Sequence, residues 1–176
     1  MDLNRFVLDL IRKKNYNWME ERRIEFVPLL SNFLNQFIQA KSILIITDEK
    51  RKWYGEYLLS KINSFNEFKP QLYPFYVLEN IVPQIKYAKN PNEFDMIEDM
   101  LNVSFEEYIF WYIGQETPLL KFAMRRSESF FWIMDEDFSN NFYLKSIDPF
   151  IDNKLMHLAD IVNESISAVV FGEVEI

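Results

Sequence analysis

The stretch SILIITDEKRKWYGEYLLS, residues 42 to 60, decides the fold, because a strand pattern changes into a helix pattern within it. Residues 42 to 47 form a continuous, isoleucine-rich apolar run, which predicts a strand buried on both faces of a sheet. Residues 50 to 64 follow with a helical pattern in which Trp53 and Tyr57 share one face. In a doubly wound α/β fold, the turn between such a strand and helix is where a phosphate-binding loop lies.

The turn itself reads TDEKRK and contains no glycine. Phosphate loops need glycine so that the backbone can approach the phosphate closely, and the chain has only 3 glycines, at positions that allow neither a G-x-G-x-x-G nor a Walker pattern. Asp48 and Glu49 place negative charge where an anion would bind, and they suit the helix dipole and an N-terminal cap. The turn therefore predicts a capped helix start rather than a phosphate site.

Strand-type and helix-type patterns alternate along the rest of the chain, which predicts an α/β fold. We expect a three-layer sandwich of about five mostly parallel strands flanked by helices, in a single domain over residues 1–176. Pro28 is expected in a first turn or at a kink, and residues 79 to 90 form the least patterned segment, a long loop. Further strands are expected at 72–78, 108–113, 130–134 and 142–144, and further helices at 2–14, 18–40, 91–103, 117–126 and 149–170.

The composition limits the class of protein. Apolar residues make up 49% of the 176 residues, which excludes a disordered chain. The net charge of −8 repels a phosphate backbone, so we expect no direct nucleic-acid contact. The chain contains 0 cysteines, which excludes disulfides and thiolate metal sites. No signal-peptide pattern and no apolar run of ~18 residues is present, so we expect a cytoplasmic protein without membrane contact.

Few residues are candidates for chemistry, and we expect no catalytic residue, no metal site and no cofactor. His157 is the 1 histidine of the chain and cannot build a multi-histidine metal site, so we interpret it as a surface or interface histidine. The segment DEDFSNN, residues 135 to 141, follows a predicted strand. Its carboxylates either hold a hard cation or form a solvated turn, and the sequence leaves both open.

Aromatic residues are abundant, with 17 Phe and 4 Trp. YIFWYIG (108 to 114) and SFFWIM (129 to 134) fit core strands, but an excess of aromatics is also typical of subunit or partner interfaces. The tail SAVVFGEVEI (167 to 176) places apolar residues beside acids. This tail is either a docking edge or a segment that packs on its own domain.

Several motifs, taken in order, resemble those of the HobA family, DnaA-binding regulators of replication initiation in epsilon-proteobacteria. The resemblance runs from about Trp18 to the C-terminus and is weakest over roughly residues 79 to 105. The motifs are Trp18-x-Glu20-x-x-Arg23, Asp48-x-x-Arg51-x-Trp53-x-x-x-Tyr57-x-Leu59-Ser60-x-x-Asn63, Phe110-Trp111-x-x-Gly114, Ser129-Phe130-x-Trp132, Asp152-x-Lys154-Leu155, Phe171 and Ile176.

The resemblance implies a modified Rossmann fold similar to sugar isomerase (SIS) domains. It also implies a homotetramer, a dimer of dimers, that binds the N-terminal domains I and II of DnaA and promotes DnaA assembly at the origin. HobA-like proteins are similar in function to the initiator-associating protein DiaA, and no enzymatic activity or cofactor is implied. We expect DnaA to dock first on Val170 and Phe171, and second on the helix that carries Arg51 and Trp53.

Two alternatives remain open from the residues. A phosphosugar-binding SIS-type isomerase domain would have a pocket near Thr47 and Asp48. A plain oligomeric α/β protein with an unrelated partner would self-associate without binding DnaA.

Overall fold

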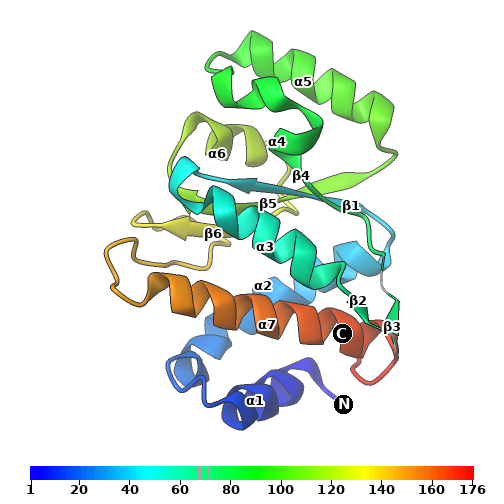
Figure 1. The fold of residues 1–176 in the computed structure, drawn as a ribbon, viewed down its shortest axis with the longest axis vertical. Helices are drawn as coiled ribbons and strands as arrows, with labels where there is room; N and C mark the ends of the chain where they lie inside the picture. Colours follow the sequence, from blue (N-terminus) through cyan, green and yellow to red (C-terminus); the bar gives the residue numbers. More distant parts are fainter. Residues whose placement is uncertain (67–68, 71) are drawn as a thin grey trace.

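The computed structural model describes residues 1–66, 69–70 and 72–176 as a layered α/β domain (Figure 1). Its elements in chain order are α1 (Leu3–Lys14), α2 (Met19–Ile38), β1 (Ser42–Thr47), η1 (Glu49–Arg51), α3 (Lys52–Ile62), β2 (Phe65–Asn66), β3 (Lys69–Pro70), β4 (Phe75–Val77), α4 (Leu78–Ile81), η2 (Pro83–Tyr87), α5 (Pro91–Ser104), β5 (Tyr108–Gln115), α6 (Pro118–Ala123), β6 (Phe130–Met134) and α7 (Ile151–Val170), where η denotes a 3₁₀ helix.

The main sheet has the strand order β4-β1-β5-β6, and all of its neighbouring strands are parallel. Ile45 of β1 pairs with Val77 of β4 on one side and with Trp111 of β5 on the other. The strand predicted from the opening stretch, β1, is therefore one of the two inner strands of the sheet. The α/β prediction with a mostly parallel sheet is confirmed. Outside it, β2 and β3 form a small antiparallel pair that the sequence did not predict.

Both faces of the sheet are covered by helices, because successive side chains of a strand point to opposite faces. Ile43 and Ile45 of β1 pack into a core beneath α2, α3 and α7. Leu44 and Ile46 pack into a second core beneath α4, η2, α5 and α6. Figure 1 shows these two helical layers on either side of the sheet. The aromatic strands β5 and β6 lie inside, with Trp111 and Trp132 both 0% exposed, so the core interpretation of these strands is confirmed.

Helix α1 packs outside the main layers against α2 and α7. Asp2 caps α1 by accepting the N–H of Arg5, and Asn15 ends the helix in a left-handed conformation. Pro28 lies in the interior of α2, so the first-turn alternative for this proline is wrong.

The main sheet has four strands, and the expected fifth strand at 142–144 is wrong. This segment meets β6 through two isolated parallel bridges, Phe131 to Asn141 and Met134 to Leu144. A parallel partner strand normally needs a connection of about a dozen residues or more, and only residues 135 to 140 separate β6 from the first bridge. The short return brings the segment beside β6 without room to build a regular strand.

The long loop expected at 79–90 is also wrong, because α4 and η2 occupy most of it. Val82, Ile85 and Ala88 are buried at a spacing of three residues, which matches the period of a 3₁₀ helix rather than that of an α-helix. The strand expected at 72–78 is shortened to β4, and Leu72 is exposed.

Candidate functional site

The sheet reverses its winding direction between β1 and β5. After β1 the chain enters α3 on one face of the sheet, and after β5 it enters α6 on the other face. A crevice opens at such a switch point, at the carboxyl ends of the two strands, and α/β proteins bind ligands there. The residues that follow Thr47 and Ile113 are therefore the first place to look for a site.

In this chain the crevice is filled by the side chain of Asp48. Its carboxylate accepts the backbone N–H of Arg51 at 3.0 Å, the Arg51 guanidinium at 2.7 Å and the backbone N–H of Gln115 at 2.7 Å. Asp48 and Arg51 are buried, 7% and 5% exposed. Asp48 thus caps η1 and pairs with Arg51 in the same chain, and the capping prediction for this turn is confirmed.

Gly114 makes this close packing possible. Its φ is +149°, which L side chains rarely adopt, and a Cβ built on it would lie 2.6 Å from Oδ2 of Asp48. In ligand-binding loops a glycine lets the backbone approach a phosphate closely. Here Gly114 lets the backbone approach the Asp48 carboxylate closely.

The polar contacts continue across the sheet to the end of β6. Gln115 donates its side-chain N–H to Asp135 at 2.7 Å, and Asp135 also accepts the backbone N–H of Ser146 at 2.8 Å. The hydrogen bond from the Ser146 hydroxyl is the main cause that lowers the pKa of Asp135. Within residues 1–66, 69–70 and 72–176, no group of three or more His, Asp or Glu side chains could hold a metal ion. Asp135 therefore works as an acceptor that joins two loops.

A cavity of about 240 Å³ lies beside the turn at Asp48, between the ends of β1 and β4 and the start of α6. Apolar side chains, among them Ile46 and Val77, form much of its wall. At its mouth Lys52 donates to Glu79 at 2.7 Å. The pocket expected near Thr47 by the isomerase alternative is thus present as a space, but Asp48 and Glu49 in its wall place carboxylates where a phosphate would bind.

The four predicted docking residues fall into two separate groups. Trp53, Val170 and Phe171 are 41%, 45% and 51% exposed, whereas Arg51 is buried against Asp48.

Helices α3 and α7 pack side by side and run in the same direction, since Tyr54 donates to the carbonyl of Leu155 and Lys61 pairs with Asp160. Trp53 therefore lies beside the first half of α7, and Val170 lies ~22 Å further along that helix. The structure of the chain does not bring the two groups together.

The C-terminal tail combines both of its predicted alternatives. Val174 is buried in the core, and the backbone of Glu175 donates to the carbonyl of Met1, so part of the tail packs on its own domain. Val170, Phe171 and Ile176 remain about half exposed beside it.

His157 belongs to a cluster that the sequence did not reveal. Its ring stacks on Tyr16 at a centroid distance of 3.9 Å, and its Nδ1 accepts the indole N–H of Trp18 at 3.0 Å. Tyr16 also donates to Asp160. Burial lowers the pKa of His157, and the nearby charge of Asp160 opposes that shift only in part. The cluster ties the corner between α1 and α2 to α7, and the sequence distance of 139 residues between Trp18 and His157 explains why no local pattern pointed to it.

The chain is similar to known proteins over nearly its whole length. The family model described as HobA, DNA replication regulator, matches residues 1–176. The DNA replication regulator protein HobA of Helicobacter pylori (strain ATCC 700392 / 26695) is 22% identical over 159 residues, which cover 89% of this chain and 86% of that protein.

Two solved structures from Helicobacter pylori have the same fold. A HobA–DnaA (domain I–II) complex superposes with a TM-score of 0.79 at 20% identity, covering 96% of this chain and 91% of that chain. The crystal structure of HobA (HP1230) superposes with a TM-score of 0.78 at 20% identity, covering 96% of this chain and 91% of that chain. Within the part of the chain that the structure describes, no helix has the length and apolar character needed to cross a membrane.

Proposed function

Because this chain belongs to the HobA family of DNA replication regulators, we propose that it is a non-enzymatic scaffold for the replication initiator DnaA. It binds the N-terminal domains I and II of DnaA in the cytoplasm and promotes DnaA assembly at the origin. The observation that carries the proposal is the match of the fold, over 96% of the chain, to a protein crystallised with DnaA domains I–II. We also propose that the sheet with its two helical layers is an SIS-type arrangement.

The filled crevice supports a role without catalysis. Asp48 occupies the place where α/β proteins bind small ligands, and its acceptor capacity is used by Arg51 and Gln115. A phosphosugar bound at the switch point itself would have to displace a buried, hydrogen-bonded ion pair, and loss of one partner of such a pair costs about 3–5 kcal/mol. Binding energy for a partner protein is instead available on the exposed side chains of the outer helices.

We propose that DnaA docks on Val170 and Phe171 at the end of α7, with Trp53 as a second contact. Exposed apolar and aromatic side chains of this kind are the typical anchors of protein interfaces. Arg51 contributes from below the surface, because its ion pair with Asp48 fixes the turn that begins α3 and carries Trp53. The ~22 Å between the two groups suits contacts made by two different partner domains or by two neighbouring subunits.

We further propose that the chain acts as a homotetramer, a dimer of dimers. A tetramer presents several copies of one docking surface, and DnaA molecules held on it meet at a raised effective concentration without any new contact between them. This is how a protein without catalytic groups promotes assembly at the origin.

Titration calorimetry of this protein against DnaA domains I–II from the same organism tests the proposal. Saturable binding with a whole-number ratio per tetramer is the expected result. Phe171→Ala should weaken binding at least about tenfold while light scattering shows an intact tetramer. Ile24→Ala is the matched control, because Ile24 is exposed on α2, away from the end of α7.

Equal affinity of Phe171→Ala and the parent protein would remove Phe171 from the docking surface. Absence of binding with both partners folded would refute the scaffold itself. Stabilisation of the protein by sugar phosphates in a thermal-shift assay would then favour the isomerase alternative.

A further inference from the structure

Helix α5 carries a second apolar stripe on the side that faces solvent. Its inner side, with Phe94, Ile97 and Leu101, packs into the core beneath the sheet. On the outer side Met96 and Val103 are 68% and 90% exposed. An amphipathic surface helix normally has charged or polar residues on this side, so the outer stripe is not needed for folding.

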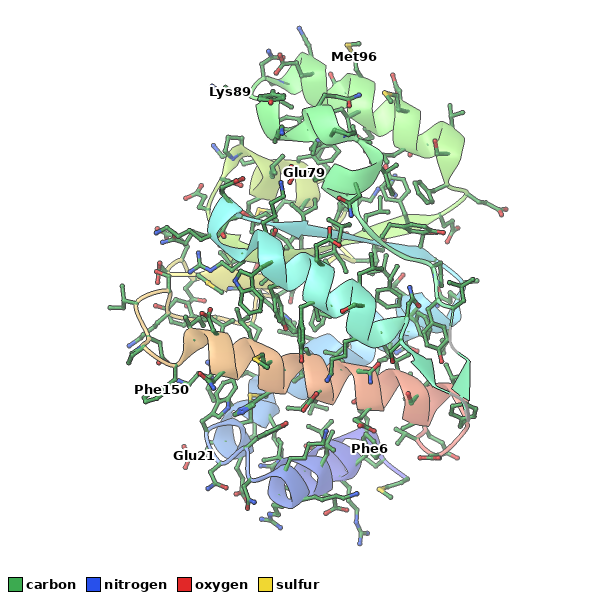
Figure 2. The ribbon with its side chains drawn as sticks, in the orientation of Figure 1. Phe6, Glu21, Glu79, Lys89, Met96 and Phe150 are labelled. Atoms are coloured by element: carbon green, nitrogen blue, oxygen red, sulfur yellow. The ribbon has the colours of Figure 1, made fainter. Side chains whose placement is uncertain are left out.

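The outer stripe borders a groove between α5 and η2. Met96 and Met100 line one wall, Tyr87 of η2 lines the other, and the buried Ile97 lies between them, around a volume of about 230 Å³. Met96, Met100 and Val103 recur at the i, i+4 and i+7 positions of the helix, so the stripe runs along nearly two turns. Figure 2 shows Met96 pointing outward from the end of the molecule formed by α5.

The side chains that form this groove are adaptable. Methionine has three rotatable bonds and a polarizable thioether, and proteins use it on surfaces that bind apolar helices. Tyr87 is 69% exposed and offers a large ring at the opposite wall. A groove with these walls fits the apolar side chains of a helix, in the helix-in-groove mode of recognition.

The rim of the groove is acidic. The sequence of α5, PNEFDMIEDMLNVS, contains four carboxylates and no lysine or arginine. Asp95 and Glu98 are bound to Arg125 at 2.8 and 2.9 Å. Glu93 lines the groove itself, and Asp99 is three residues from Met96, which makes the two neighbours on the helix surface.

The nearby lysines of η2 and of the following turn do not change this sign. Lys86 and Lys89 line the cavity beside Thr47, but they also reach the groove. The Lys86 Nζ lies 5.0 Å from the centre of the Tyr87 ring, and the backbone N–H of Lys89 donates to Glu93 at 2.7 Å. The four carboxylates of α5 still outnumber these two lysines and Arg125. A second copy of this chain, packed α5 against α5, would bring Glu93 and Asp99 of both copies together, and like charges across an interface are unfavourable.

We propose that the groove lined by Tyr87, Met96 and Met100, together with Val103 further along the same stripe, is a second docking surface, which binds a basic amphipathic helix of a partner protein. Apolar residues of that helix, spaced by three or four positions, fill the groove, and lysine or arginine residues beside them pair with Glu93 and Asp99. The surface goes beyond the proposed function, because α5 covers the face of the sheet opposite to α7, where Val170 and Phe171 lie (Figure 1). The scaffold can then hold DnaA on one side and a second, basic partner on the other.

A pair of model peptides tests the proposal without knowledge of the partner. The first is a fluorescein-labelled amphipathic helix of about 18 residues with leucines on one face and lysines on the other, and the second replaces each lysine with glutamate. We expect saturable binding of the lysine peptide to the tetrameric protein, followed by fluorescence anisotropy at ~0.15 M salt. The glutamate peptide should bind at least about tenfold more weakly.

The variant Met100→Glu separates the groove from general charge attraction. It adds a negative charge, which would strengthen a purely electrostatic contact with the lysine peptide, yet we expect binding to weaken at least about tenfold because the apolar wall is lost. Ile24→Glu makes the same change of charge on α2, where the residue is 73% exposed, and should leave binding unchanged.

Absence of binding by the lysine peptide, or equal binding by Met100→Glu and the parent protein, would overturn the proposal. DnaA domains I–II should bind with unchanged affinity when the peptide is saturating. Competition between them would show that the groove is part of the DnaA site and not a second surface. Because the peptide assay needs no DnaA, its result stands apart from that of the calorimetric test.

Discussion

Replacing each partner of the ion pair between Asp48 and Arg51 should have unequal effects on stability. Asp48→Ala removes the acceptor of three hydrogen bonds and leaves the Arg51 guanidinium buried without its partner. Removal of one partner of a buried ion pair costs about 3–5 kcal/mol. Arg51→Met removes one charged hydrogen bond, worth about 1.5–3 kcal/mol, while Asp48 keeps the two backbone N–H groups of residues 51 and 115. We therefore expect Asp48→Ala to be the more destabilising change, by about 2 kcal/mol from the middles of these ranges.

Urea unfolding followed by circular dichroism measures this difference, at one fixed protein concentration because oligomers gain stability with concentration. The dependence of the unfolding free energy on urea should be the same in both variants, since neither changes the surface exposed on unfolding. Asp137→Ala, an exposed carboxylate in the turn after β6, should lie within about 0.5 kcal/mol of the parent protein. If Arg51→Met costs as much as Asp48→Ala, the reasoning that Asp48 is held mainly by the backbone is refuted.

Two further changes test other parts of the structure. Gly114→Ala should destabilise the protein by about 1–3 kcal/mol from its φ alone, with more from the contact to Asp48, and an unchanged melting temperature would contradict the tight packing at this point. Burial lowers the pKa of His157 from its ordinary value of 6.5, so the folded state binds fewer protons than the unfolded chain. The free energy of unfolding should therefore decrease as the pH is lowered below about 6.5. The urea midpoint measured between about pH 5 and pH 7.5 checks this, and His157→Gln should reduce the slope. An identical slope in the variant would assign the pH dependence to other groups.

The sequence predicted those elements whose pattern is local and strong. Residues 42 to 47 are apolar without interruption because both faces of β1 are buried, and residues 91 to 103 begin with Pro91 after an Asn90 cap that the structure contains. The loop prediction for residues 79–90 was wrong because the buried residues of this segment recur at every third position. That spacing fits a short 3₁₀ helix and matches neither an α-helix nor a strand.

The candidate site shows a different limit. Arg51 matches the family pattern, and its position in a charged turn is typical of an exposed residue. Its burial depends on Asp48, whose contact with Gln115 joins positions 67 residues apart in the chain. The sequence predicted that Asp48 caps a turn without a phosphate site. No window along the sequence contains both Asp48 and Gln115, so the contact that closes the crevice became visible only in the fold.

The placement of the 4 tryptophans allows the intrinsic fluorescence of the protein to report on separate parts of the structure. Trp111 and Trp132 are enclosed in the core, so we expect from them a blue-shifted emission that iodide does not quench. Trp53 is open to solvent at the proposed docking surface, and Trp18 is bound to His157. A shift in the quenchable part of the emission therefore reports an event at α3, and a change in intensity on acidification reports the α1–α2 corner, both without an added label.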